Sequence, residues 1–282
     1  MLLVHAHPDD ETLTTGATMA KYAAQGARVT LVTCTLGEQG EVIPAGLKRL
    51  EADADDALGP HRAEELAAAM AALGVTDHRL LADGRWRDSG MAWVEPGIAG
   101  SGAWVARPDA LVNADLAEAA EALAAVLREV RPQVVVTYDP AGGYGHPDHI
   151  KAHEITTAAV DLVSADGFVE AVYWVRVPRT WAERERAALA AGDGVPASMT
   201  RPAPDAAYPP TVVDDAVVTT VVDGSAYLDR KRAALLAHAT QVRVEGDWFA
   251  LSNDEAHWLT GHEAYQRVGA EPGTGWSGDL FS

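Results

Sequence analysis

The sequence is short of three features that would point to other classes of protein. Its 282 residues include one cysteine, Cys34, so no disulfide can form within the chain. No apolar run reaches about 18 residues, and we therefore expect no transmembrane helix. Basic residues are few, 22 against 41 acidic ones, which gives a net charge of −19. Because such a surface repels nucleic acid and anionic lipid, we expect neither nucleic-acid nor membrane partners. The single cysteine fits a reducing compartment, and together with the lack of a long apolar run it predicts a cytoplasmic protein.

Strands and helices are predicted in alternation over the first 178 residues. The hydrophobic fraction of 48% is typical of a globular chain, so we expect a buried core. The predicted strands cover residues 2–4, 29–34, 78–81, 134–138 and 169–175, and the predicted helices cover 15–25, 61–73, 115–130 and 150–163. This repeated order predicts an α/β fold, a Rossmann-like and mostly parallel sheet with helices on both faces.

The composition changes after residue 178. The pattern there predicts a helix over 181–191, a long loop over 194–210, a strand over 211–222, a helix over 226–238 and a loosely ordered end over 273–282. We therefore expect a catalytic core over residues 1–178. A smaller α+β part over 179–282 should pack beside it and form a wall of the site.

Two clusters of histidine and acidic residues directly follow predicted strands. The segment His5–Glu11 reads HAHPDDE and follows the apolar run Leu2–Val4. The segment Tyr144–His149 reads YGHPDH and follows the strand predicted over 134–138. Open α/β sheets bind ligands at the carboxyl ends of their strands. The two clusters therefore predict one site that is divided between two distant segments.

The residue types in these clusters favour a metal-dependent hydrolase. A mononuclear catalytic metal usually has three protein ligands and one position open for water. His7 and Asp10 are three residues apart across a proline-containing turn, and His149 is the natural third ligand. Zn²⁺ would bring the pKa of a bound water close to neutrality, and Fe²⁺ is the alternative metal. Asp9 is not needed as a ligand and is therefore available as the general base.

Three further residues of the second cluster have predicted catalytic roles. The Tyr144 hydroxyl can donate a hydrogen bond to an oxyanion that develops opposite the metal. His146 can assist in the same role. We expect Asp148 to fix the tautomer of His146 through the other ring nitrogen.

The residues that form the two histidine motifs also resemble a known family. His7–Glu11 together with His146–His149 resembles the zinc N-deacetylases of N-acetylglucosaminyl-phosphatidylinositol and related sugars, the PIG-L/LmbE-like family. The resemblance covers roughly residues 1–160 and a stretch near 230–253. Segments 33–38, 85–91, 137–149 and 237–242 look like the branch of that family that acts in mycothiol biosynthesis.

The resemblance implies an activity and a set of residue roles. The implied reaction is zinc-dependent hydrolysis of the acetamide of an N-acetylglucosaminyl-inositol, with release of acetate. The implied ligands are His7, Asp10 and His149, and Asp9 is implied as the base and then as the acid for the leaving amine. The remaining implied roles are oxyanion or substrate contacts for Tyr144 and His146, support of His146 by Asp148, and contacts to sugar or inositol hydroxyls by Arg62, Asp88 and Glu41.

Several alternatives stay open from the sequence. The same chemistry could act on a larger amide, that of a mycothiol S-conjugate. Two histidines and one carboxylate also form the ligand set of iron(II) oxygenases, and a sugar-binding protein without catalysis is a third reading. Asp9 could cap a helix, Tyr144 could be a packed loop aromatic, and Arg62 could lie on a solvated face. The sequence predicts no oligomeric state.

Overall fold

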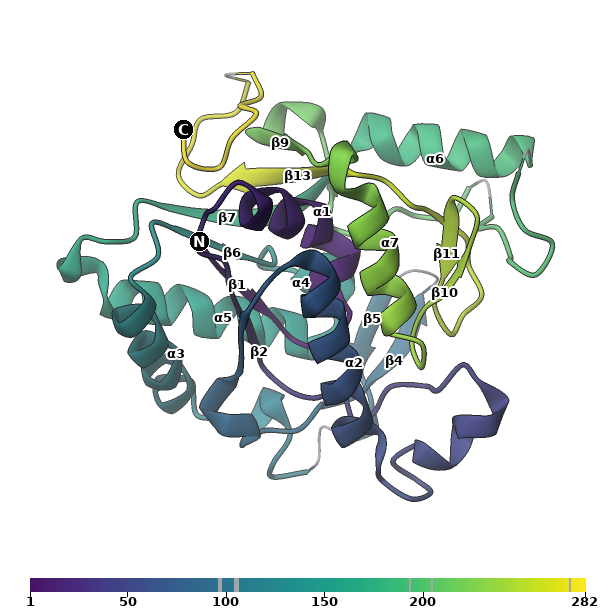
Figure 1. Cartoon of the computed structure of the whole chain (residues 1–282), viewed down its shortest axis with the longest axis horizontal. Helices are drawn as coiled ribbons and strands as arrows, with labels where there is room; N and C mark the ends of the chain where they lie inside the picture. Colours follow the sequence, from purple (N-terminus) through teal and green to yellow (C-terminus); the bar gives the residue numbers. More distant parts are fainter. Residues whose placement is uncertain (96–97, 104–106, 193, 204, 274) are drawn as a thin grey trace.

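A computed structural model describes residues 1–95, 98–103, 107–192, 194–203, 205–273 and 275–282 (Figure 1). The helices are α1 (Asp10–Ala24), α2 (Leu58–Leu73), α3 (Leu116–Val130), α4 (Gly142–Gly145), α5 (Pro147–Leu162), α6 (Arg179–Ala191) and α7 (Leu228–Ala237). The strands are β1 (Leu2–His5), β2 (Thr30–Thr33), β3 (Asp77–Leu80), β4 (Met91–Glu95), β5 (Ile98–Ser101), β6 (Val134–Thr137), β7 (Ala171–Pro178), β8 (Val212–Val213), β9 (Thr220–Asp223), β10 (Arg243–Glu245), β11 (Trp248–Ala250), β12 (His257–Trp258) and β13 (His262–Arg267). Short 3₁₀ turns cover Ala45–Leu50, Leu81–Gly84, Leu111–Asn113, Ser164–Asp166, Asp215–Val217 and Ser225–Tyr227.

The main sheet has eight strands, in the order β3-β2-β1-β6-β7-β13-β9, with β8 paired to β7. Strands β1, β2, β3, β6 and β7 run parallel, which confirms the predicted mostly parallel α/β fold. The chain moves outward from β1 to β2 and β3 and then returns to place β6 on the other side of β1. The strand order therefore reverses between β1 and β6, and such a switch point leaves a crevice at the carboxyl ends of the two strands.

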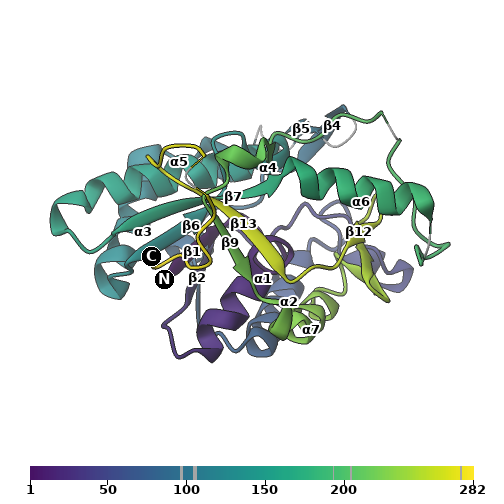
Figure 2. The same cartoon turned by 90° about the horizontal axis from the view of Figure 1, so that it is seen from above.

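Helices cover both faces of the sheet, as predicted (Figure 2). Leu2 and Val4 of β1 pack with residues of α3 and α5, whereas Leu3 packs with residues of α1 and α2 on the opposite face. Successive strand residues point to opposite faces, so an uninterrupted apolar run is what a doubly covered strand requires. The described helices include none that is both long and apolar enough to cross a lipid bilayer.

The C-terminal third adds strands to the same sheet. Strand β13 pairs antiparallel with β7 on one side and with β9 on the other. The single strand predicted over 211–222 is wrong, because it is two strands, β8 and β9, separated by the turn Asp215–Val217. Asp214 accepts the N–H of Ala216 at 2.9 Å and so begins this turn. Strands β10, β11 and β12 form a separate small sheet.

The prediction of a loosely ordered C-terminal end over 273–282 is also wrong for the described residues 273 and 275–282. Leu280 is buried, and its N–H donates to the Tyr22 hydroxyl at 2.8 Å. The same hydroxyl donates to Asp279 at 2.7 Å. An apolar anchor and two hydrogen bonds to α1 thus hold an end whose glycines had suggested disorder. Residue 274 lies outside the described residues.

Candidate active site

The two sequence clusters meet at the switch point between β1 and β6. His7 and Asp9 lie in the turn that follows β1, and Asp10 is the first residue of α1. His146 and His149 follow β6, at the start of α5. The sequence pattern predicts a helix from residue 15, but α1 begins five residues earlier, so Asp10 is held on a helix and not in a loop.

Two imidazoles face one oxygen of Asp10. Nδ1 of His7 and Nε2 of His149 each lie 3.3 Å from Oδ2 of Asp10. The same oxygen accepts the Tyr138 hydroxyl at 2.7 Å and the N–H of His7 at 3.0 Å. Ligand atoms about 2.0–2.2 Å from one tetrahedral Zn²⁺ are separated by roughly 3.3–3.6 Å. Each of the two nitrogen–oxygen separations is therefore compatible with a pair of ligands that share one ion.

The hydrogen bonds of His149 leave one ring nitrogen without a partner. Its Nδ1 lies 3.2 Å from the carbonyl oxygen of Gly142, which can accept only an N–H. In the neutral ring, Nε2 therefore bears a lone pair, and this atom is buried without a hydrogen-bond partner. A lone pair directed at a carboxylate is repulsive unless a cation lies between them. The donor set thus fits a metal ion.

His7 has the same arrangement with a different carboxylate. Its Nε2 lies 3.3 Å from Oδ2 of Asp148 and 3.5 Å from Oδ1 of Asp88. A proton on Nε2 leaves the Nδ1 lone pair facing Asp10. Burial by itself would lower the pKa of His7, but the carboxylates of Asp88, Asp10 and Asp148 raise it well above its ordinary value. This concentration of negative charge also favours a cation.

The described residues contain two overlapping groups of potential metal ligands. Within each group, the ligand atoms all lie within 4.8 Å of one another. One group is His7, His146 and His149, and the other is His7, Asp88 and Asp148. His7 belongs to both groups and His149 to the first, whereas Asp10 belongs to neither and meets the cluster through its 3.3 Å approaches to His7 and His149. His7 is therefore the centre of the cluster.

His146 is positioned as a neutral hydrogen-bond donor. It is the residue that caps α5, and its Nδ1 accepts the N–H of Asp148 at 3.1 Å. The ring proton of the neutral form is then on Nε2. Burial, together with the neighbouring rings of His7 and His149, holds the pKa of His146 well below its ordinary value. His146 can therefore donate from Nε2 at neutral pH.

The expected support of His146 by the Asp148 carboxylate is wrong. Oδ2 of Asp148 accepts the N–H of Ser89 at 2.8 Å and lies 3.3 Å from Nε2 of His7. Only the backbone N–H of Asp148 reaches His146. The reason is the helix geometry at the start of α5. His146 is the capping residue and turns its ring back to the helix end, whereas the Asp148 side chain points toward His7.

Asp9 has a strained backbone and a partly neutralised carboxylate. Its φ of 112° and ψ of −36° are rarely adopted by residues other than glycine. Its side chain makes no capping bond to α1, and Oδ2 instead lies 3.1 Å from Nη2 of Arg62. Burial raises the pKa of Asp9 to about 6, although Arg62 acts in the opposite direction. A strained residue beside a candidate metal centre is typical of an active site.

The three residues predicted to contact substrate hydroxyls have different environments. Arg62 is buried and donates to the carbonyl oxygens of Pro8 and Gly37 as well as to Asp9. Asp88 is also buried, and its oxygens accept the N–H groups of Gly90 and Gln39 at 2.8 and 3.1 Å. Glu41 is exposed. The structure therefore brings Arg62 and Asp88 into contact with the cluster through Asp9 and His7, whereas Glu41 makes no hydrogen bond or ion pair to the described residues of the cluster.

Tyr144 stands beside the histidines with its hydroxyl available. Its ring centroid lies 5.0 Å from that of His149 and 6.1 Å from that of His146. No described residue is hydrogen-bonded to the Tyr144 hydroxyl. The loop that bears Tyr144 can pack closely against the start of α5 because residue 142 is glycine. Gly142 has a φ of 64°, and a Cβ there would lie 2.7 Å from the backbone nitrogen of Ile150.

Sequence reasoning missed two features that hold the site together. The Tyr138 ring is stacked on His149 with centroids 4.2 Å apart, and its hydroxyl binds Asp10. A tyrosine that directly follows β6 was a signal that could have been used. The second feature is the pair formed by Glu11 and His238, in which Oε1 and Nε2 are 2.8 Å apart. Glu11 and His238 are 227 positions apart, and no sequence pattern links them, so the sequence could not predict this contact.

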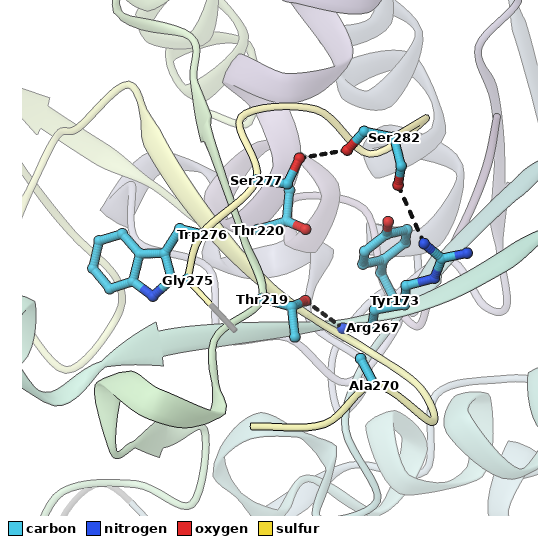
Figure 3. Close-up of a pocket in the computed structure, with 9 residues that line it drawn as sticks. All are labelled: Tyr173, Thr219, Thr220, Arg267, Ala270, Gly275, Trp276, Ser277 and Ser282. Atoms are coloured by element: carbon cyan, nitrogen blue, oxygen red, sulfur yellow. Dashed lines mark hydrogen bonds between the residues drawn. The ribbon is translucent and has the colours of Figure 1, made fainter. Parts of the chain in front are cut away.

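A separate hollow of about 430 Å³ lies away from this cluster, beside β7, β9 and β13 (Figure 3). It is lined by Tyr173, Thr219, Thr220, Arg267, Ala270, Gly275, Trp276, Ser277 and Ser282. This lining has one charged side chain, Arg267, and offers neither an acid–base pair nor a set of metal ligands. The candidate metal ligands therefore lie at the switch point and not in this hollow.

An α/β sheet with imidazoles and carboxylates converging at its switch point defines an α/β enzyme with a candidate metal centre. Residues 2–160 match the family described as PIG-L, GlcNAc-PI de-N-acetylase. The chain therefore belongs to the PIG-L family.

Relatives of known name are similar to the chain over its whole length. A protein of Streptomyces avermitilis named 1D-myo-inositol 2-acetamido-2-deoxy-alpha-D-glucopyranoside deacetylase is 53% identical over 293 residues, covering 100% of this chain and 96% of the relative. A protein of Acidothermus cellulolyticus with the same name is 52% identical, covering 100% and 94%. The fold is similar to that of a solved teicoplanin deacetylase in its zinc-inhibited form. That match has a TM-score of 0.55 and 20% identity, and covers 95% and 97% of the two chains.

Proposed function

We propose that the protein hydrolyses the acetamide of 1D-myo-inositol 2-acetamido-2-deoxy-α-D-glucopyranoside, giving glucosaminyl-inositol and acetate, a reaction of mycothiol biosynthesis. One observation carries the proposal. Nδ1 of His7 and Nε2 of His149 converge on Oδ2 of Asp10, and a strained Asp9 is next in the chain. The names of relatives that match over the full length support the choice of substrate.

In this proposal His7, Asp10 and His149 would hold one Zn²⁺, and Fe²⁺ is the alternative ion. The unpartnered Nε2 of His149 supports this assignment. When bound, a divalent cation lowers the pKa of water and polarises the amide carbonyl. Asp148 takes a role that differs from the predicted one, because its carboxylate holds the proton on Nε2 of His7 and so leaves the Nδ1 lone pair facing Asp10, where it would be available to a metal ion.

Asp9 transfers the proton. Its carboxylate accepts a proton from the attacking water and then delivers it to the leaving amine. Arg62 holds this carboxylate at 3.1 Å and also fixes the turn through the carbonyl oxygens of Pro8 and Gly37. A base of this kind typically contributes on the order of 10²–10⁴ in rate.

His146 and Tyr144 stabilise the oxyanion that forms from the acetamide carbonyl. His146 donates from Nε2, because its Nδ1 is occupied by the N–H of Asp148. Tyr144 donates from a hydroxyl that the described residues leave available. Removal of one such donor typically costs roughly 3–4 kcal/mol of transition-state stabilisation.

The proposal also includes the predicted substrate contacts, the division of the chain and the compartment. Asp88 and Arg62 meet sugar or inositol hydroxyls from the inner side of the site, and Glu41 does so from the exposed loop after β2. Residues 1–178 form the catalytic core, and residues 179–282 form a part that walls it. The proposed substrate has only neutral hydroxyl and acetamide groups, so the acidic surface of the protein does not oppose its binding. The lone buried Cys34 is in keeping with a cytoplasmic enzyme.

Acetate release from the proposed substrate tests the function directly. Under anaerobic conditions and with Zn²⁺ as the only metal, we expect stoichiometric acetate and glucosaminyl-inositol. Faster turnover of a bimane-labelled mycothiol adduct would instead identify an S-conjugate amidase. A requirement for oxygen would identify an oxygenase, and binding without acetate release would leave a sugar-binding protein.

A further inference from the structure

An exposed tryptophan stands next to the candidate oxyanion residue Tyr144. Trp93 of β4 is 51% exposed, and its ring centroid lies 6.0 Å from that of Tyr144, with the two planes at 30°. The Tyr144 ring is in turn 5.0 Å from the imidazole of His149. Two ring-to-ring steps therefore lead outward from the candidate metal site to an indole that faces solvent.

The position of Trp93 is fixed from both strands of its hairpin. In the β4–β5 pair, Trp93 is opposite Ala99, and the hairpin lies beside α4 (Figure 2). A Cβ on Gly145 of α4 would lie 2.6 Å from the Ala99 carbonyl oxygen, so the two backbones are in direct contact. Gly145 also has a φ of 95°, and both features require glycine. The hairpin thus rests on the loop that bears Tyr144.

The start of the hairpin is anchored in the site itself. β4 begins at Met91, directly after the segment of Asp88 and Ser89. The N–H of Ser89 donates to Asp148 at 2.8 Å, and the N–H of Asp88 donates to Glu38 at 2.9 Å. Trp93 therefore keeps a defined place relative to the catalytic cluster, although its indole is exposed.

We propose that Trp93 is a stacking platform for the second ring of the substrate, the inositol, and so determines specificity for a two-ring glycoside. This inference rests on the proposed function. Most hydroxyls of myo-inositol are equatorial, so the faces of its ring present C–H groups that can pack on an indole. An uncharged polyol has no ion-pair partner, and apolar contact with an aromatic face is the interaction that can hold it.

The test compares a two-ring substrate with a truncated one. Steady-state kinetics are measured with the inositol glycoside and with methyl 2-acetamido-2-deoxy-α-D-glucopyranoside, which lacks the inositol. We expect Trp93→Ala to raise KM for the inositol glycoside roughly tenfold and to leave kcat and the methyl glycoside constants unchanged. Trp93→Phe should retain most of the affinity, because it keeps an aromatic face.

Trp276→Ala is the matched control. Trp276 is 46% exposed, but it lines the hollow beside β9 and β13 (Figure 3). We expect no change in either substrate's constants for this variant. Equal losses on both substrates in Trp93→Ala, or no loss on either, would overturn the proposal. A lower sedimentation coefficient of Trp93→Ala with unchanged kinetics would show instead that the hairpin binds a second copy.

A binding measurement separates this inference from the proposed reaction. Calorimetric titration with glucosaminyl-inositol measures the affinity for a ligand that contains the inositol ring, whether or not the protein releases acetate. Weaker binding to Trp93→Ala than to wild type supports the platform even if the wild type proves inactive. Equal binding by the two proteins refutes the platform even if the wild type is an efficient deacetylase.

Discussion

Nε2 of His238, the residue that ends α7, lies 2.8 Å from Oε1 of Glu11 on α1, and both side chains are fully buried. Oε2 of Glu11 accepts the N–H of Asp9 at 2.9 Å. The C-terminal third of the chain is therefore connected through one buried pair to the backbone of the candidate base.

The free energy of unfolding should depend on pH through His238. Burial alone would lower the pKa of His238, but the Glu11 carboxylate outweighs it and raises the pKa above its ordinary value. A raised folded-state pKa gives a stabilisation that is complete below about pH 6.5 and is lost as pH rises through that pKa. We expect His238→Ala to lower the free energy of unfolding by roughly 3–5 kcal/mol below pH 6.5.

His238→Gln is the control, because it keeps a hydrogen-bond donor and removes the charge. We expect a smaller loss than for alanine and a flatter pH profile than for the wild type. Urea denaturation over a pH series measures both quantities. Parallel profiles for wild type and His238→Gln would show that His238 is uncharged in the folded protein.

The strained backbone of Asp9 predicts an unusual order of stabilities. Its φ of 112° disfavours every residue that has a Cβ, whereas glycine adopts this conformation at little cost. We expect Asp9→Gly to be about 1 kcal/mol more stable than Asp9→Ala, although glycine normally destabilises a chain relative to alanine. Denaturant unfolding of the two variants compares them, and a more stable alanine variant would argue against the strain.

Asp148 should act on metal affinity rather than on His146. Its carboxylate lies 3.3 Å from Nε2 of His7, and loss of such a partner typically reduces metal affinity 10–100-fold. We expect Asp148→Asn to weaken Zn²⁺ binding by roughly that factor in a chelator competition. Asp161→Asn, on the exposed side of the same helix, should bind Zn²⁺ like the wild type. Unchanged affinity in Asp148→Asn together with reduced kcat would restore the original assignment to His146.

Arg62 should support the turn of Asp9 more than it supports substrate affinity. Its guanidinium reaches two carbonyl oxygens and the Asp9 carboxylate, and an ammonium group cannot reproduce that planar set of donors. We expect Arg62→Lys to lose roughly 1–3 kcal/mol of stability and to lower kcat more than it raises KM. Stability and steady-state kinetics are measured together with the exposed-site control Arg49→Lys. A change confined to KM would show that Arg62 acts through its substrate contact alone and does not support the turn of Asp9.

The fold was predictable where local patterns determine it. The apolar runs of β1 and β6 and the helical spacing of α3 identified a parallel sheet with two covered faces. Strand β13 could not be found in this way. Its sequence HEAYQR has no clean alternation, and Glu263 within it is buried because Lys231 lies 2.8 Å from its carboxylate. That pairing depends on a contact between separate elements.

The site was predictable as a set of residues and less so as a set of contacts. The histidine motifs brought His7, Asp10 and His149 to one place because strand ends of a parallel sheet meet at one edge. The predicted partner of the Asp148 carboxylate, His146, is wrong. Proximity along the chain favoured it over the actual partner, His7, which is 141 positions away. Glu11 and His238 were missed for the same reason.

The measurement that bears most directly on the catalytic centre is the metal content of purified Asp9→Asn and His149→Ala, taken with their rates of acetate release. We expect Asp9→Asn to retain about one Zn²⁺ per chain, as three ligands remain, while its kcat falls on the order of 10²–10⁴-fold. His149→Ala should lose both the metal and the activity. Full metal occupancy in His149→Ala, or an empty site in Asp9→Asn, would contradict the division between the three residues that hold the ion and the one that moves the proton.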